Sequence, residues 1–476
     1  MLIIIIGIFL RFYRIRELTT FLSDQAIELS GARQILHGDL ALIGIKTSNS
    51  EVRNGAVMYY VLAPFLYFFS LDPIAGGILQ SLLSISTVIL VYFLGKRFIN
   101  DNAGLFAALF VSASPLLVKF SRQTMLAFYP LFFTTLGLLF AIKIIKSEKK
   151  YFKYIILLGF LTGFVLQIHY STVSLFLFSC LLPVIFKLKI KKLLYYFWFS
   201  GGFILGVSPL IIFELRNRFF NSKMFLAYLS GNHIDTLHFS FNHVFYWIDS
   251  IGKVYGAQNW WLAVIIFAII AWRIMKWRTK LEVLEKLCLL QIGSTFIFTT
   301  LFVREMVVHY GISAFVPIAL LLGTSINKII NLRMSPKYLL FFIIFTISFI
   351  YLNYPYYGLT DNHGWMMTSG WNLPAVEKSA VLIANNRQNE KFNVAMVVDA
   401  QNQGIPLRYF LTNLGEEPLS FSDYESADLL YVVTEPGINL KEIKMWEIIS
   451  FGNFKIDKTW PVQNEFLLFR LSKNNV

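Results

Sequence analysis

Residues 76–97 read GGILQSLLSISTVILVYFLGKR, in which 20 uncharged residues are followed by two cations, Lys96 and Arg97. A helix needs about 20 mostly apolar residues to cross a bilayer, so this segment alone could span one. Similar segments recur along the 476-residue chain, which is 56% hydrophobic with a mean hydropathy of +0.59. This composition excludes a water-soluble enzyme and predicts an α-helical polytopic membrane protein.

The basic loops decide the orientation of these segments. Nineteen Lys and Arg residues fall at every second connection, whereas the short loops between them hold three, Lys119, Arg122 and Arg304. Because basic loops stay on the cytoplasmic side, residues 14–75, 119–125, 215–258 and the C-terminal part are expected on the outer side. We expect the protein to lie in a cell membrane, and a bacterial cytoplasmic membrane is favoured. The N-terminus is expected on the cytoplasmic side. The eleven expected spans lie near residues 2–13, 76–95, 103–118, 126–146, 154–170, 172–187, 193–214, 259–275, 284–303, 308–327 and 338–354.

Two segments near the start do not follow this pattern. Residues 2–13 are short for a crossing and are followed by arginines on the outer side, so either the real start lies upstream or this helix is truncated. Residues 55–71 are apolar and rich in Tyr and Phe. Counting them as a span would invert every later loop, so we interpret them as an interfacial or re-entrant helix.

The chain changes character at Pro355. Residues 355–476 hold 10 Lys and Arg against 14 Asp and Glu, a balance of −4, while the rest of the chain has a balance of +18. Amphipathic and β-like runs alternate here: LPAVEKSAVLIANNRQ and GIPLRYFLTNLG predict helices, FNVAMVVDA and ADLLYVVTE predict buried strands, and MWEIISFGNF and NEFLLFRLS are strand-like. We therefore expect a transmembrane catalytic domain over 1–354, with juxtamembrane helices in 14–75, and a small extracytoplasmic α/β domain over 355–476.

Metal and nucleic-acid chemistry have little support in the sequence. Cys180 and Cys288 lie within apolar runs and are expected to be packing residues. His233, His238 and His243 recur every five residues, which matches neither one face of a helix nor one face of a strand. No basic face with interleaved aromatic residues predicts nucleic-acid binding.

A polar stretch in the first outer segment, FLSDQAIELSGARQILHGD (residues 21–39), carries the most informative side chain. Asp24 stands there at the mouth of the expected helix bundle. An ionisable residue in such a place is a functional-site hypothesis by default. The alternative is a helix N-cap, because Ser23 and Asp24 precede a helical pattern and Glu28 follows closely.

Several stretches in their order along the chain resemble the GT-C glycosyltransferases, in particular the branch of protein O-mannosyltransferases and lipid A aminoarabinose transferases. They are SDQAIELSGARQILHGDL, EVRNGAVMYYVLAP, the block from VYFLGKRFINDN to QTMLAFYPLFF, LQIHYS, FELRNRFFNSK and HYGISAFVPIALLLG. Two departures bear on a metal: Gln25 stands where the family usually has Glu, and MLAFYP lacks an Asp that is often present. A divalent metal is therefore possible but is not supported by the motif.

The resemblance implies transfer of a hexose or pentose from a polyprenyl-phosphate lipid to a glycan, lipid or protein acceptor, with inversion of configuration and with Asp24 as the base. Cations and polar groups would bind the leaving phosphate or the substrates. Glu51 with Arg53 could instead be a surface pair, and Arg122 and Arg304 could extend to the lipid headgroups. His169 could simply bond to the next helix. The candidates are Glu51, Arg53, Arg122, His169, Glu214, Arg216, Arg304, His309 and Tyr310.

Two other functions fit the sequence less well. A lipid or glycan transporter, such as a flippase, would show inverted repeats and charges at mid-membrane, whereas the ionisable residues here gather at the outer ends of the spans. An O-antigen ligase or polymerase would concentrate its function in one large late loop, whereas the distinctive segment here is the first outer one.

Overall fold

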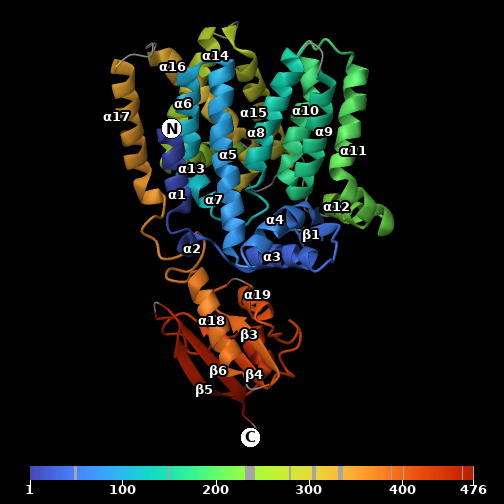
Figure 1. The fold of residues 1–476 in the computed structure, drawn as a ribbon, viewed down its shortest axis with the longest axis vertical. Helices are drawn as coiled ribbons and strands as arrows, with labels where there is room; N and C mark the ends of the chain where they lie inside the picture. The colour runs from blue at the N-terminus through green and yellow to red at the C-terminus, as the bar shows by residue number, and fades with distance from the viewer. Residues whose placement is uncertain are drawn as a thin grey trace.

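The computed structural model describes residues 1–47, 51–147, 151–230, 242–277, 280–302, 307–330, 336–387, 389–399, 401–463 and 465–474. It has a helical bundle at one end and a small α/β domain at the other, with short helices between them (Figure 1). We call the end of the bundle that faces the α/β domain the α3 end.

The bundle consists of apolar helices, several of which are long enough to cross a bilayer. Within the described ranges, six helices are long and apolar enough to cross a membrane, or seven if one bent pair is counted. The chain is thus a multi-pass membrane protein, while the exact count of eleven spans remains a prediction. The bundle helices are α1 (Leu2–Phe12), α5 (Ile74–Phe98), α6 (Asp101–Ser112), α7 (Pro115–Phe120), α8 (Pro130–Lys146), α9 (Tyr151–Ile168), α10 (Val173–Ile185), α11 (Lys192–Arg216), α13 (Asn242–Tyr255), α14 (Trp260–Trp277), α15 (Val283–Phe302), α16 (Ile312–Ile330) and α17 (Pro336–Asn353).

Two of the bundle segments are broken rather than continuous. The segment expected over 103–118 divides into α6 and α7, because Pro115 cannot continue a helix and Ser114 caps the new one by accepting the N–H of Leu117. Helices α13 and α14 meet at 97°. Ala257 and Gln258 occupy the left-handed region at this corner, so the chain turns sharply there.

The first polar segment forms a layer across the α3 end (Figure 1). It comprises α2 (Ile15–Leu18), α3 (Ser23–Leu36), an antiparallel pair of strands, β1 (Ile43–Lys46) and β2 (Arg53–Gly55), and α4 (Val57–Phe68). At 1.5 Å per residue, the 12 residues of α4 rise about 18 Å, too little to cross a membrane. The short helix α12 (Phe220–Ser230) lies at the same end.

The C-terminal part is a four-stranded sheet of order β3-β4-β6-β5 with helices packed on it. Strands β3 and β4 are parallel and entirely buried, as expected for two continuous apolar runs. Residues 446–451 are helical, so the strand predicted over MWEIISF is wrong; the strand begins after Gly452. The elements are α18 (Leu373–Asn386), β3 (Phe392–Met396), α19 (Ile405–Asn413), β4 (Leu429–Thr434), α20 (Trp446–Phe451), β5 (Phe454–Pro461) and β6 (Leu467–Lys473).

Helices α9 and α11 approach each other through glycines. Gly159 and Gly163 on α9 face Gly202 and Gly206 on α11, and a Cβ at any of them would overlap backbone atoms of the opposite helix. Small residues four apart let two membrane helices pack backbone to backbone. The same contact fixes the α3 ends of both helices, where His169 and Glu214 lie.

Gly202→Ala should lower the melting temperature of the detergent-solubilised protein, because its methyl group would collide with the Ile156 carbonyl. Overpacking of this kind costs about 1–3 kcal/mol. The matched control is Gly201→Ala, since no atom lies within 4 Å of the site of its Cβ. Equal melting temperatures for the two variants would contradict the proposed packing.

Candidate functional site

Asp24 lies in the first turn of α3. The helix begins at Ser23, and its N-cap is Leu22, whose backbone N–H donates to the Gln25 side chain at 3.0 Å. Capping therefore does not explain Asp24. The side chain is exposed, and within the described ranges its carboxylate has no hydrogen bond or ion pair. A carboxylate in the first turn also interacts favourably with the helix dipole.

Two further carboxyl groups surround Asp24. Desolvation by the surrounding chain and, secondly, the Asp399 carboxylate raise the pKa of Asp24. One turn along α3, Glu28 is buried, and its Oε2 has no hydrogen-bond partner. Burial and the neighbouring Asp24 raise the pKa of Glu28 to about 8, so Glu28 is largely protonated at neutral pH.

Sequence reasoning missed Glu28 and Asp399. Spacing could have identified Glu28, because residues four apart lie on the same face of a helix. No local signal could have identified Asp399, which lies after β3 and 375 positions from Asp24. Its Oδ2 accepts the Ser23 hydroxyl at 2.5 Å.

The hairpin β1–β2 holds Arg53 and Glu51 in different surroundings. Glu51 pairs with Lys46 across the hairpin, and both are exposed. The backbone of Arg53 is fixed on both sides: its N–H donates to Asn221 at 3.0 Å, and its carbonyl accepts Asn221 Nδ2 at 2.9 Å and the Tyr170 hydroxyl at 2.8 Å. The exposed guanidinium makes no hydrogen bond or ion pair within the described part of the chain and is available to a ligand.

His169, His309 and Tyr310 come together, although 140 residues separate the two histidines. Their rings lie with centroids 5.3 Å apart for His169–His309 and 6.0 Å apart for His169–Tyr310. His169 caps the 3₁₀ turn η1 (Tyr170–Thr172), while His309 and Tyr310 belong to η3 (Val308–Gly311). Burial and His309 lower the pKa of His169 to about 3, so this imidazole is neutral at physiological pH.

Glu214 organises the segment that holds the hairpin. At the end of α11, it accepts the backbone N–H groups of Asn221 and Ser222, each at 2.9 Å, and thereby orders the start of α12. Asn221 in turn holds Arg53. Glu214 is thus linked to the cation indirectly. Arg216 is exposed on the last turn of α11.

The remaining candidates differ in their surroundings. Arg122 is buried and donates to the carbonyl oxygens of Leu10 and, at 3.3 Å, Tyr357, so its contacts join α1 to the chain that leads to the C-terminal domain. Burial lowers its pKa to about 10. Arg304 lies outside the described residues, as do His233 and His238. Over the ranges described, no three His, Cys, Asp or Glu residues are arranged to hold a metal ion, and no step below involves one.

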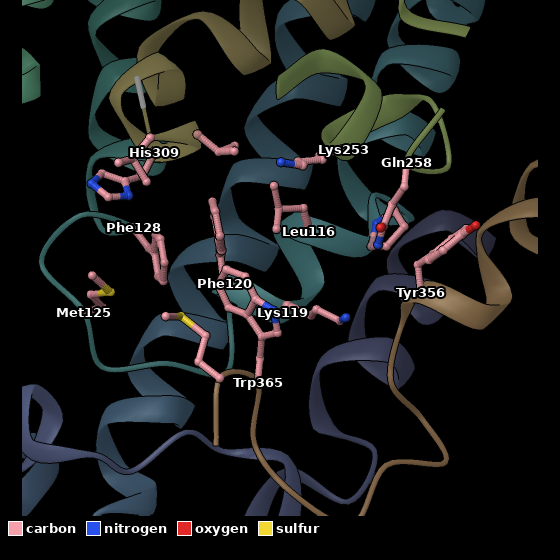
Figure 2. Close-up of a pocket in the computed structure, with 14 residues that line it drawn as sticks. Leu116, Lys119, Phe120, Met125, Phe128, Lys253, Gln258, His309, Tyr356 and Trp365 are labelled. Carbon is pink, nitrogen blue, oxygen red and sulfur yellow. The ribbon is translucent and has the colours of Figure 1, made fainter. Parts of the chain in front are cut away.

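A cavity of about 460 Å³ lies beside His309. Figure 2 shows His309 at one side, Lys119 and Lys253 among the lining residues, and Phe120, Phe128 and Trp365 grouped as an aromatic wall. Phe120 and Phe128 stack with centroids 3.7 Å apart. An apolar wall with cations at its edge suits an anionic amphiphile. The Trp365 carbonyl accepts the Thr20 hydroxyl at 2.8 Å, so the chain that leads into α3 forms the back of this wall.

The chain has the fold of known membrane transferases. Residues 54–213 match the family of dolichyl-phosphate-mannose-protein mannosyltransferases. The structure is similar to that of ArnT from Cupriavidus metallidurans in the apo state, with a TM-score of 0.66, 12% sequence identity, and coverage of 98% of this chain and 97% of that one. It is similar to ArnT bound to undecaprenyl phosphate with a TM-score of 0.65, 11% identity and the same coverage of both chains. It also resembles the arabinofuranosyltransferase AftD from Mycobacteria, with a TM-score of 0.56, 12% sequence identity, and coverage of 100% of this chain and 40% of that one. No curated protein sequence matches the chain. The GT-C resemblance predicted from the sequence is confirmed.

Glu28→Gln should change how stability depends on pH. A carboxyl whose pKa rises from 4.5 to about 8 on folding binds an extra proton in the folded state. Its stabilising contribution is complete below pH 4.5 and is lost as the pH rises toward 8, by at most about 1.4 kcal/mol per pH unit. The melting temperature of wild type should therefore fall between pH 5 and 8 relative to Glu28→Gln. Glu51→Gln, which removes an exposed carboxylate, should follow wild type; parallel curves for all three would contradict the burial argument.

Proposed function

We propose that the protein is a membrane glycosyltransferase that moves a sugar from a polyprenyl-phosphate lipid to an acceptor hydroxyl, with Asp24 as general base. The family match, the GT-C fold and the undecaprenyl phosphate bound to the similar ArnT support this class of donor. The placement of the basic loops supports a reaction on the outer face of a bacterial cytoplasmic membrane, with eleven spans and an extracytoplasmic C-terminal domain.

The placement of Asp24 carries the proposal. Its carboxylate is exposed and unpaired in the described part of the chain, at the α3 end of the bundle, where the Arg53 guanidinium and the His169–His309–Tyr310 cluster also lie. Tyr59 of α4 connects the two regions, because Glu28, one turn from Asp24 on α3, and Arg53 both act on it electrostatically. One face of the molecule therefore supplies a base and a cation, the two groups that this transfer requires.

The reaction follows from these groups. Asp24 takes the proton of the acceptor hydroxyl, and the oxygen attacks the anomeric carbon. The bond from that carbon to the phosphate oxygen breaks with its electrons, and polyprenyl phosphate leaves. A single displacement inverts the configuration. The raised pKa makes Asp24 a stronger proton acceptor than an ordinary aspartate, provided that it is ionised.

Arg53 is the phosphate ligand that the structure supports best. Its backbone is held at three points while its side chain remains exposed, so a guanidinium is presented from a fixed base. Guanidinium groups bind phosphate oxygens in a bidentate manner. Neutral His169 and Tyr310, at the same end of the bundle, can donate or accept hydrogen bonds. Arg122 is committed to backbone carbonyls and serves as a structural residue in this scheme.

Asp24→Asn should lower the turnover number about 10²–10⁴-fold, because the amide cannot accept the proton. The measurement is release of radiolabelled sugar from a panel of polyprenyl-phosphate sugars by the purified protein. Asp39→Asn is the matched control, since Asp39 is an exposed carboxylate just beyond the same helix. Full activity of Asp24→Asn would remove it as the base. No release by wild type with any donor and acceptor would contradict the function itself.

Arg53→Ala should raise the KM for the lipid donor at least tenfold while changing the KM for the acceptor little, because a lost charged hydrogen bond costs about 1.5–3 kcal/mol. Steady-state kinetics with each substrate varied in turn would show this. Arg97→Ala removes an exposed cation from the other end of α5 and should behave as wild type. Equal increases in both KM values would argue against a phosphate role.

A further inference from the structure

The C-terminal domain contacts the start of α3 directly. Phe21 packs edge-on against Tyr409 and Phe410 of α19, with ring centroids 5.7 and 5.6 Å away. At the other end of α3, Arg33 donates to Asn413 at 2.8 Å. The helix that carries Asp24 is therefore bound along its length by the C-terminal domain.

Asp399 is the residue of that domain whose charge acts on Asp24. It is 5% exposed, and it lies on the loop that follows β3, where its Oδ2 accepts the Ser23 hydroxyl at 2.5 Å. Ser23 directly precedes Asp24. The Asp399 carboxylate is therefore fixed in place by a charge-assisted hydrogen bond beside a second carboxylate.

We propose that Asp399 is a positioning residue for Asp24: it fixes the first turn of α3 through Ser23 and places a negative charge that strengthens Asp24 as a proton acceptor. The inference rests on the proposed function, since it assigns a role in the same transfer. It gives the C-terminal domain a part in the reaction rather than one in acceptor binding or shielding alone.

The cations of the elements packed on α3 have partners of their own. Arg408 of α19 donates to the carbonyls of Gln403 and Leu419 inside its own domain. Lys46 of β1 pairs with Glu51. The remaining groups are Glu28 on α3 itself, the buried Tyr59 and Tyr129, on both of which Glu28 acts electrostatically, and Tyr409 of α19, whose hydroxyl donates to the Leu71 carbonyl. Of these, only Asp399 and Glu28 are carboxyl groups coupled to Asp24.

Three variants separate the two effects of Asp399. In Asp399→Asn the amide oxygen can still accept the Ser23 hydroxyl, so only the charge is lost. In Ser23→Ala the bond is lost and the charge stays. In Asp399→Ala both are lost. Asn413→Ala is the matched control, because it breaks another contact between α3 and the C-terminal domain, with Arg33, without changing the charge near Asp24.

The experiment is the pH profile of kcat/KM for sugar transfer by the full-length protein. Without the negative charge Asp24 stays ionised to lower pH, so the acid limb of Asp399→Asn should move down by roughly 0.5–1 pH unit. Asn413→Ala should keep the wild-type profile. An unmoved acid limb in Asp399→Asn, or an equal movement in Asn413→Ala, would overturn the proposal.

Hydrogen exchange tests the positioning without activity. Amides of residues 24–30 should exchange at least several-fold faster in Asp399→Ala and Ser23→Ala than in Asp399→Asn. Unchanged exchange in the first two would overturn the proposal even if sugar transfer is observed. If wild type transfers no sugar while exchange responds as expected, the proposed function fails and the contact between Asp399 and α3 stands.

Discussion

The geometry at Asp24 depends on α3 being held from two sides. On the bundle side, α3 buries Glu28 without a hydrogen bond to its Oε2, which is costly for any carboxyl group. On the other side, Ser23 and Arg33 bond to Asp399 and Asn413 of the C-terminal domain. These bonds to the C-terminal domain offset the cost of burying Glu28, because they oppose the outward movement of α3 that would let Glu28 reach water.

Much of the fold could be predicted because it follows from periodic patterns. Long apolar runs and alternating basic loops indicate a membrane bundle, and continuous apolar runs indicate buried strands such as β3 and β4. Local departures from these patterns are harder to predict from the sequence. MWEIISF has apolar and β-branched residues typical of a strand, yet it forms α20, because Ile448 and Phe451 lie three apart on one face and pack into the core of the sheet domain. Pro115 was a visible signal that the span over 103–118 would break.

The site could be predicted only in part, since its members meet through tertiary structure. Residue types at the ends of expected spans singled out His169 and His309, but only the packing of α8, α9, α10, α15 and α16 brings their rings to 5.3 Å. Arg122 shows the converse. Its position just beyond a span fits either phosphate binding or contact with lipid headgroups, whereas the bonds that it makes are to backbone carbonyls of distant segments.

The carboxyl groups around Asp24 differ from the pattern that the resemblance implies. Gln25 replaces the usual Glu, and its side chain accepts the Leu22 N–H, so this position serves the helix terminus. Acidic groups appear instead at Glu28, on the buried face of the same helix, and at Asp399, from another domain. In the described part of the chain, the influences that raise the pKa of Asp24 are desolvation and, secondly, the Asp399 carboxylate, and no cation opposes them. A base flanked by carboxyls holds its proton more firmly once it has taken it, which favours abstraction from a weakly acidic hydroxyl. The same fold can therefore support one chemistry with different acidic partners, because the role is defined by charge and position rather than by one sequence motif.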